Sequence, residues 1–317
     1  MKVALVGYGR WGKNIYNTLN NSTRVDEILI CDPALNKTNL KEEINFNEIL
    51  RNKKIEAVFV ATPATTHFEI TKKLLEANKN VFCEKPLCFS TEEAVEISNL
   101  INQSKATFVS GHTYLFNDTL NFVKNYIQNN NLDFKTISGK YCSLGTNILD
   151  VDVLWDLGPH AVSISNYLFD DKPDKVTLIP TSYTKDNKLE SCFLNLIYKS
   201  QNVMFELSWI NIIKKREIEF NGIETSIRWN DIDIDRPIEI IKSKVKDRFE
   251  PGVFAHLHSN SNSYEVPAIN PEEPLKNELN YFIDSVKNNN YKNLRSGIDF
   301  SVDVIEVLEE ASFQVKN

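Results

Sequence analysis

Apolar runs rich in β-branched residues alternate with amphipathic stretches through the first third of the chain. Each run is short, as expected for a buried strand, and ends in glycine or in polar residues. This alternation predicts a parallel sheet with right-handed crossovers and helices on both faces. We expect its strands at residues 2–6, 27–31, 57–61, 81–83 and 107–110.

Two of the helices between these strands have start signals in the sequence. Thr66 and Glu69 fit a capping box, in which two residues hydrogen-bond each other's backbone, and so do Ser90 and Glu93. We therefore expect one helix to begin at Thr66 and the next at Ser90.

The pattern changes after about residue 117. A helix is predicted over 119–128 and a strand over 134–143, and between 176 and 240 short strands follow one another across tight turns. Strands joined in this way form an antiparallel sheet. The sequence therefore predicts two domains, at residues 1–117 and 118–317.

Three further helices are expected in the second domain. One should begin near Gly158 and Pro159, because proline is tolerated in the first turn of a helix. Another follows Pro274, and the last spans residues 298–305 and could pack back on the first domain. Residues 241–270 are expected to include a long loop.

A glycine-rich turn follows the first strand. Residues 7–12 read Gly-Tyr-Gly-Arg-Trp-Gly, and this G-x-G-x-x-G pattern between a strand and a helix is the dinucleotide-binding fingerprint. In that fingerprint Gly7 allows the tight turn and Gly9 allows a pyrophosphate to approach the backbone. Gly12 allows the helix to pack closely on the strand.

The residues after this turn complete the fingerprint. A helix with one apolar face is predicted by the helical spacing of Trp11, Ile15 and Leu19. Because this helix begins at the glycine-rich turn, the free N–H groups at its N terminus would face the phosphates. Asp32 follows the second strand about twenty residues later, where an acid accepts hydrogen bonds from ribose hydroxyls. Because Asp32 would also repel a 2′-phosphate, we expect NAD rather than NADP as the cofactor.

Charge, cysteine spacing and the lengths of the apolar runs limit the kinds of partner that the protein could bind. The formal net charge is −7, which argues against a nucleic-acid-binding surface. The five cysteines include no C-x-x-C pair, so neither a disulfide framework nor a metal site is indicated. No apolar run is long enough to span a bilayer or to act as a signal peptide, and we expect a cytoplasmic protein without a membrane partner.

Two later stretches carry candidate chemistry, Glu84-Lys85-Pro86 and Asp156-Leu-Gly-Pro-His160. Alone, the lysine could be a solvated charge and the histidine a packing residue or a cap. Together they match what alcohol oxidation needs, because hydride goes to the nicotinamide and a proton goes to a base. Imidazole titrates near neutrality, a carboxylate can orient it, and a lysine can stabilise an alkoxide. If the turn is helical, Asp156 and His160 share one face.

Five motifs occur in an order that resembles the glucose–fructose oxidoreductase / inositol dehydrogenase (Gfo/Idh/MocA) family. The closing helix, with Glu278 and Phe282, also fits. The motifs are Gly7-Tyr-Gly-Arg-Trp-Gly-Lys-Asn14, Ala61-Thr-Pro63 with His67, Glu84-Lys85-Pro86, Gly111-His112-Thr113 and Trp155-Asp-Leu-Gly-Pro-His160.

The resemblance implies an α/β fold class: an N-terminal Rossmann domain with a parallel sheet, and a C-terminal α+β domain with a large, open, mostly antiparallel sheet. It implies a hydride-transferring, nicotinamide-dependent oxidoreductase without a metal. Lys85, Asp156 and His160 match the family's catalytic residues. The implied cofactor-binding positions are Gly7, Tyr8, Gly9, Arg10, Trp11, Gly12 and Asp32, with Thr62, Pro63, His67, Glu84 and Lys85 nearby.

Within the family, residues 9–14 and 153–160 look most like the branch that oxidises the 3-hydroxyl of nucleotide-linked sugars. Gly158 and Ala161 depart from that branch, which usually has Ala and Asp there. Lys140 and Asn147 are the candidates for contacting the diphosphate of the substrate. The alternatives are a dehydrogenase or ketoreductase of a free sugar or polyol, and a non-catalytic dinucleotide-binding sensor. The intact set of three catalytic positions argues against the sensor.

Assembly follows from the second sheet. An antiparallel sheet with helices on one face leaves its other face needing cover. The strands at 192–198 and 203–209 are apolar enough to be buried on both sides. We therefore expect a homodimer or homotetramer in which these sheets pack face to face.

Overall fold

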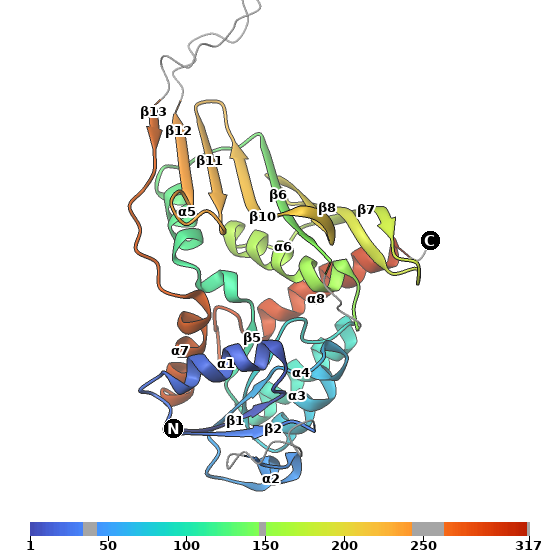
Figure 1. Ribbon diagram of the computed structural model, residues 1–317, viewed down its shortest axis with the longest axis vertical. Helices are drawn as coiled ribbons and strands as arrows, with labels where there is room; N and C mark the ends of the chain where they lie inside the picture. The colour runs from blue at the N-terminus through green and yellow to red at the C-terminus, as the bar shows by residue number, and fades with distance from the viewer. Residues whose placement is uncertain (34–42, 146–149, 243–262, 316–317) are drawn as a thin grey trace, which may run out of the picture. The chain divides into compact units, whose positions relative to one another are not determined.

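The computed structural model describes residues 1–33, 43–145, 150–242 and 263–315 (Figure 1). The chain forms two compact units, each with its own sheet. Unit 1 comprises Met1–Asn117, Ile148–Ile164 and Glu272–Phe313, and unit 2 comprises the rest. Asp156 and His160 therefore belong to the same unit as Lys85.

Unit 1 has a five-stranded parallel sheet in the order β2-β1-β3-β4-β5. This confirms the parallel sheet that the sequence predicted. Strands β1, β3, β4 and β5 are almost fully buried, as expected for a parallel sheet covered on both faces, whereas the edge strand β2 has exposed and half-buried residues. Their bounds are β1 Lys2–Val6, β2 Glu27–Cys31, β3 Ala57–Val60, β4 Asn80–Glu84 and β5 Phe108–Gly111.

The core of unit 1 joins β1, β3 and β4 to two helices that are far apart in sequence. Val3, Phe59 and Phe82 pack with Ile15 of α1 and Phe282 of α7. The rings of Phe59 and Phe282 meet edge to face, with centroids 5.3 Å apart. The helices of unit 1 are α1 Arg10–Asn20, α2 Phe46–Arg51, α3 His67–Glu76, α4 Thr91–Ser104, α7 Pro274–Lys287 and α8 Ile298–Phe313, with the 3-10 turns η2 Ala64–Thr66 and η3 Thr113–Phe116.

Of the two predicted capping boxes, the one at Ser90 is confirmed for its N-cap half only, since Glu93 accepts from the Phe89 backbone N–H at 3.1 Å, and the one at Thr66 is wrong. The Ser90 hydroxyl accepts from the Glu93 backbone N–H at 3.2 Å, so α4 begins as predicted. The Thr66 hydroxyl caps nothing and instead donates to the Thr62 hydroxyl at 2.7 Å. The reason is that η2 precedes α3, so Thr66 already has near-helical backbone angles, whereas an N-cap residue is extended.

Trp11 also departs from the predicted helix face. The buried face of α1 is formed by Gly12, Ile15 and Leu19, while Trp11 is 41% exposed. Its indole Nε1 donates to the carboxylate of Glu84, which holds the ring off the core face.

Helix α6 (Val153–Phe169) begins earlier than the sequence predicted. The carboxylate of Asp152 accepts from the backbone N–H of Trp155 at 3.1 Å and caps the helix start. Pro159 therefore lies inside the helix, where its missing N–H leaves the carbonyl of Trp155 without the usual donor. Asp156 and His160 consequently stand one helical turn apart.

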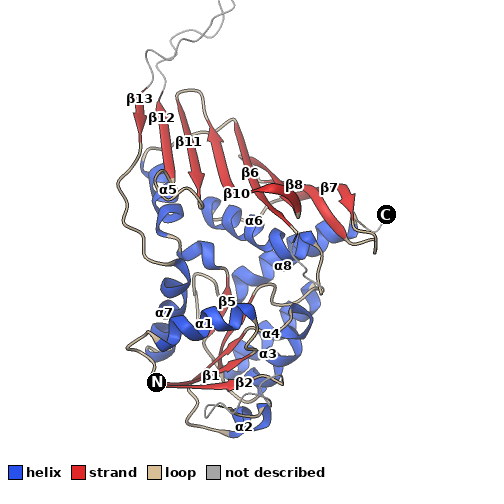
Figure 2. Cartoon of the chain, viewed as in Figure 1, coloured by secondary structure: helices blue, strands red, loops and turns tan. Residues whose placement is uncertain are grey.

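Unit 2 contains an eight-stranded sheet in the order β13-β12-β11-β10-β6-β9-β8-β7 (Figure 2). All neighbouring strands are antiparallel except β6 and β9, which confirms the mostly antiparallel prediction. Helix α5 (Asp118–Asn129) packs on β11, where the Trp229 indole donates to the Thr119 hydroxyl at 2.8 Å. The strands are β6 Thr136–Leu144, β7 Lys175–Tyr183, β8 Leu189–Ile197, β9 Asn202–Ser208, β10 Ile210–Asn221, β11 Thr225–Asn230, β12 Ile238–Lys242 and β13 Ser263–Glu265.

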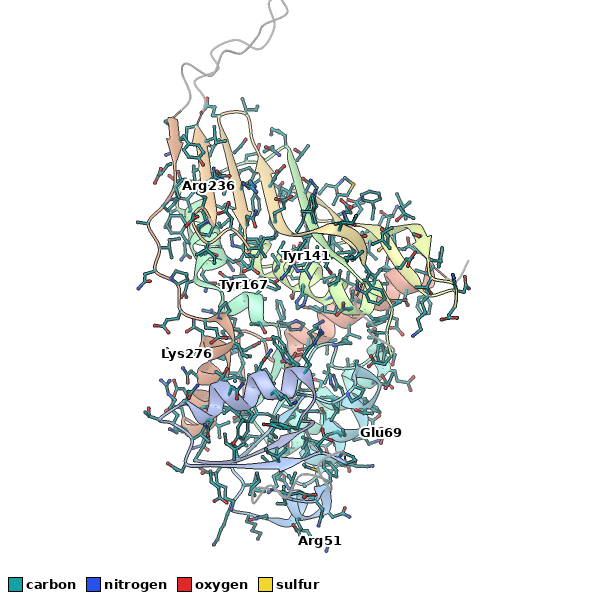
Figure 3. All side chains as sticks on the ribbon, in the orientation of Figure 1. Arg51, Glu69, Tyr141, Tyr167, Arg236 and Lys276 are labelled. Carbon is teal, nitrogen blue, oxygen red and sulfur yellow. The ribbon has the colours of Figure 1, made fainter. Side chains whose placement is uncertain are left out.

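The two faces of this sheet differ. Tyr141, labelled in Figure 3, and Phe205 are fully buried on one face. On the other face Ile179, Phe193 and Met204 are 60%, 36% and 48% exposed. The strands that the sequence predicted to be buried on both sides thus have one exposed face within a single chain.

Two further expectations from the sequence concern the substrate contact of Asn147 and membrane-spanning segments. Asn147, a candidate for contacting the substrate, lies outside the described residues. Among the helices of the described ranges, none is long and apolar enough to cross a membrane.

Candidate active site

The glycine-rich turn is built by close backbone packing at two of its three glycines. Gly7 has a φ of +96°, and a Cβ there would lie 2.5 Å from the carbonyl oxygen of Ala61. A Cβ on Gly12 would lie 2.1 Å from the carbonyl oxygen of Gly7. At Gly9 a Cβ would meet no atom within 4 Å, and no side chain caps the helix that begins after it. This helix start fits an anionic group, because the first N–H groups of a helix need acceptors.

Asp32 lies directly after β2, beside this turn. Its carboxylate accepts from the backbone N–H of Tyr8 at 2.6 Å, so the structure brings these two predicted residues together. Arg10 follows Gly9 and is exposed. The acid is thus held next to the turn, as a group that receives a ribose must be.

His67 links the loop after β3 to the loop after β4. Its ring Nδ1 lies 2.7 Å from the carbonyl oxygen of Pro86, and its Nε2 lies 2.9 Å from that of Thr62. Burial lowers the pKa of His67, and the two carbonyl contacts oppose this shift. Pro63 directly precedes the turn η2, which lies between Thr62 and His67. The ring therefore fixes Pro86, the neighbour of Lys85.

Lys85 and Asp156 are in direct contact. The Lys85 ammonium donates to the Asp156 carboxylate at 3.0 Å and to the Asp156 backbone carbonyl at 2.7 Å. The two side chains are 17% and 15% exposed, so the pair is shielded from water yet still accessible. Two hydrogen bonds to one residue fix the position of the ammonium group.

His160 lies one turn of α6 beyond Asp156, on the same face of the helix. Its ring packs edge to face on that of Tyr114, with centroids 5.0 Å apart. The structure thus places all three predicted catalytic residues in unit 1, with Lys85 and Asp156 in contact and His160 beside Tyr114. No pattern in the sequence predicted that Tyr114 would contact the histidine.

Glu84 ends β4 and is only 6% exposed. Its Oε1 accepts from the Trp11 indole at 2.5 Å and its Oε2 accepts from the Lys85 backbone N–H at 3.3 Å. Burial raises the pKa of Glu84 to about 7, against the lowering effect of Trp11 and Lys85. Glu84 therefore titrates near neutrality.

Two further titratable groups were not among the predicted site residues. His112 follows β5, and burial together with Lys85 lowers its pKa to about 3, which keeps the ring neutral. Glu278 is fully buried on α7, accepts from the Thr113 hydroxyl at 2.7 Å, and has its pKa raised by burial and by Glu84. An acid within the apolar stripe of a predicted helix is the sequence signal that could have identified Glu278.

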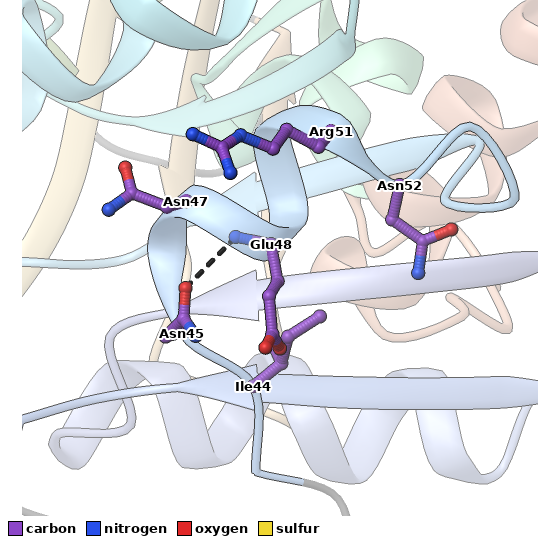
Figure 4. A pocket seen from close by; sticks show the side chains of 6 residues that line it. All are labelled: Ile44, Asn45, Asn47, Glu48, Arg51 and Asn52. Carbon is purple, nitrogen blue, oxygen red and sulfur yellow. Dashed lines mark hydrogen bonds between the residues drawn. The ribbon is translucent and has the colours of Figure 1, made fainter.

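A separate hollow of about 520 Å³ lies around α2 (Figure 4). None of the predicted site residues lines it, so we do not assign it to the active site. Its lining residues are Ile44, Asn45, Asn47, Glu48, Arg51 and Asn52.

Comparison with known proteins finds a family model that is similar to the first part of the chain. Residues 1–112 match the GFO_IDH_MocA model, which describes an oxidoreductase family with an NAD-binding Rossmann fold. The match covers residues 1–112 only and agrees there with the resemblance to the Gfo/Idh/MocA family found in the sequence.

The curated relatives match over part of their length. The chain is 27% identical over 130 residues to the 2,7-anhydro-N-acetylneuraminate hydratase of Escherichia coli, a match that covers 39% of the chain and 35% of that protein. The first curated relatives are thus matched over about a third of their length, 34–36%.

Solved structures match over nearly the whole chain. A UDP-N-acetylglucosamine 3-dehydrogenase from Acidithiobacillus ferrooxidans superposes with a TM-score of 0.78 at 14% identity, covering 100% of this chain and 99% of that one. A 3-ketoreductase from Actinomadura kijaniata, solved with TDP-benzene and NADP, gives 0.80 at 12% identity, covering 98% and 96%. At these identities the likeness shows that the fold is shared.

Proposed function

We propose that the chain is a nicotinamide-dependent oxidoreductase that transfers a hydride between its cofactor and a ring hydroxyl carbon of a sugar. The observation that carries the proposal is the contact of Lys85 with Asp156, one helical turn from His160, in the unit that holds the glycine-rich turn. A protein that only senses a dinucleotide has no need of this set.

The residues around the glycine-rich turn fit a dinucleotide. The open space at Gly9, the uncapped start of α1 and the fixed carboxylate of Asp32 match pyrophosphate and ribose respectively. When bound, the nicotinamide supplies the hydride chemistry. Asp32 supports NAD over NADP, because its carboxylate can accept from two hydroxyls but repels a phosphate.

Three side chains divide the remaining work. His160 takes the hydroxyl proton, because imidazole exchanges protons near neutral pH. The Lys85 ammonium donates a hydrogen bond to the substrate oxygen and stabilises the developing alkoxide. Asp156, which the sequence suggested as the carboxylate orienting His160, accepts from Lys85, so we assign it to fix the ammonium group.

For the substrate we propose the 3-hydroxyl of a nucleotide-linked hexose, an N-acetylated sugar or its uronate. Support comes from the motifs at residues 9–14 and 153–160, and from the UDP-N-acetylglucosamine 3-dehydrogenase and the 3-ketoreductase solved with TDP-benzene, which share the fold. Lys140 supports the diphosphate contact less well, because its ammonium lies 3.7 Å from the carboxylate of Glu217. A free sugar or polyol remains the alternative substrate.

The experiment that tests the function uses matched pairs of substrates. The purified protein is mixed with NAD and either a nucleotide sugar or the corresponding free sugar, and NADH formation is followed by absorbance. Reduction with the nucleotide sugar only is the expected result. Reduction of NAD with free glucose or inositol only would reject a nucleotide sugar as the substrate but would still support a dehydrogenase. Tight cofactor binding without turnover of any alcohol would favour the sensor.

We further propose that the protein acts as a homodimer or homotetramer through the exposed face of the unit 2 sheet. Ile179 and Phe193 are direct cross-strand neighbours on that face, and Met204 lies on the next strand. Apolar side chains gathered on an open sheet face favour burial against a second copy.

A further inference from the structure

Trp11 is an exposed aromatic residue that is hydrogen-bonded to a buried group. Its side chain is 41% exposed, yet its indole N–H donates to a buried carboxylate, that of Glu84. The two residues are separated by most of the first domain, with one in the first turn of α1 and the other at the end of β4. The hydrogen bond therefore fixes an exposed aromatic ring beside the glycine-rich turn.

The carboxylate of Glu84 is held on three sides. Besides Trp11, it accepts from the backbone N–H of Lys85 through Oε2. On the neighbouring strand, a Cβ on Gly111 would lie 2.8 Å from the same oxygen, so the carboxylate rests directly on the backbone of β5. A group packed this closely has little freedom to move, and neither has the indole bound to it.

The charged and titratable groups around Glu84 explain how a buried acid can hold the Trp11 indole in place. The Lys85 ammonium donates to Asp156 on α6, whereas the backbone N–H of Lys85 donates to Glu84. His112 at the end of β5 is neutral. Glu278 on α7 is fully buried with only the Thr113 hydroxyl donating to it, which favours its protonated form.

We propose that Glu84 is a positioning residue that clamps the Trp11 indole to the end of β4, and thereby fixes the glycine-rich turn relative to Lys85. The exposed face of the clamped ring is a flat surface against which a planar ring of a bound cofactor can pack. The part of the inference that concerns the cofactor rests on the function proposed above. The clamp itself is a property of the chain alone.

The test separates the clamp from the cofactor. In the cofactor-free protein, the indole N–H resonance of Trp11 is identified by its loss in Trp11→Phe, and its hydrogen exchange is measured by NMR. Exchange should be about tenfold faster in Glu84→Ala, the equivalent of one lost hydrogen bond, and close to wild type in Glu84→Gln, which keeps an acceptor oxygen. Glu76→Ala, an exposed residue of α3, is the control that should change nothing.

Titration with NADH then measures what the clamp does. Trp11→Phe and Glu84→Ala should each weaken binding about tenfold, the double variant should bind no more weakly than either single one, and Glu84→Gln should stay within about twofold of wild type. Unchanged indole exchange in Glu84→Ala, or additive losses in the double variant, would overturn the inference. A wild type that binds no nicotinamide cofactor would overturn the proposed function, and the exchange measurement would still decide the clamp.

Discussion

Replacing Glu84 with Gln should make the stability of the protein less dependent on pH. Burial raises the pKa of Glu84 from its ordinary value of 4.5 to about 7. Below about pH 4.5 the acid is protonated in both the folded and the unfolded chain, so it costs nothing. As the pH rises toward 7, only the unfolded chain loses the proton readily, and the folded state loses stability.

Each unit of pKa difference is worth about 1.4 kcal/mol, so this one group should lower the free energy of unfolding by about 2–3 kcal/mol between about pH 5 and pH 8. The Gln side chain keeps an oxygen for the Trp11 indole but has no proton to lose. The free energy of unfolding of the variant, measured against that of wild type, should therefore increase by this amount over the same pH range.

Urea unfolding followed by circular dichroism at several pH values measures this difference. Glu76→Gln serves as the control, because Glu76 is exposed on α3. If the difference between Glu84→Gln and wild type stayed constant across the range, then Glu84 would not be held in a desolvated state and the reasoning would be refuted.

Other predictions address the cofactor, the turn and the assembly. Asp32→Ala should narrow the preference for NADH over NADPH by ~1–3 kcal/mol in calorimetric titrations, the scale of a lost hydrogen bond to a charged group, and tighter NADPH binding by wild type would contradict the role of Asp32. Gly12→Ala should lower the melting temperature, because its Cβ would lie 2.1 Å from the carbonyl oxygen of Gly7. Gly9→Ala should have the melting temperature of wild type but bind NADH more weakly. Equal melting temperatures of the two variants would count against the close packing at Gly12. Light scattering at micromolar concentration should give a dimer or tetramer that Phe193→Asp dissociates, and a monomeric wild type would exclude assembly through the sheet.

The parts of the fold that could be predicted are those written in local patterns. The parallel sheet of unit 1 follows from short apolar runs, and the mostly antiparallel sheet of unit 2 follows from strands joined by tight turns. The conformation of Gly7 and the close packing of Gly12 follow from the spacing of the fingerprint. The sequence also singled out Lys85 and Asp156, which the structure brings into contact.

The parts that could not be predicted depend on partners distant in the chain. Trp11 leaves the core face of α1 because Glu84, 73 positions later, accepts its indole N–H. Helix α6 begins before the start predicted from Pro159, because the carboxylate of Asp152 caps the helix there. Glu278 was noted in the sequence as part of the closing helix, but its contact with Thr113 arises because α7 packs beside η3.

The measurement that tests the central claim most directly is the rate of hydride transfer in a single turnover. Wild type, His160→Ala and Lys85→Ala are loaded with NAD, mixed with the substrate found in the paired assay, and followed by stopped-flow fluorescence of NADH. Lys73→Ala, an exposed lysine of α3, is the control. We predict that both site variants bind NAD like wild type but react ~10²-fold or more slowly, as expected for lost acid–base and alkoxide stabilisation. Near wild-type rates in both variants would contradict the account.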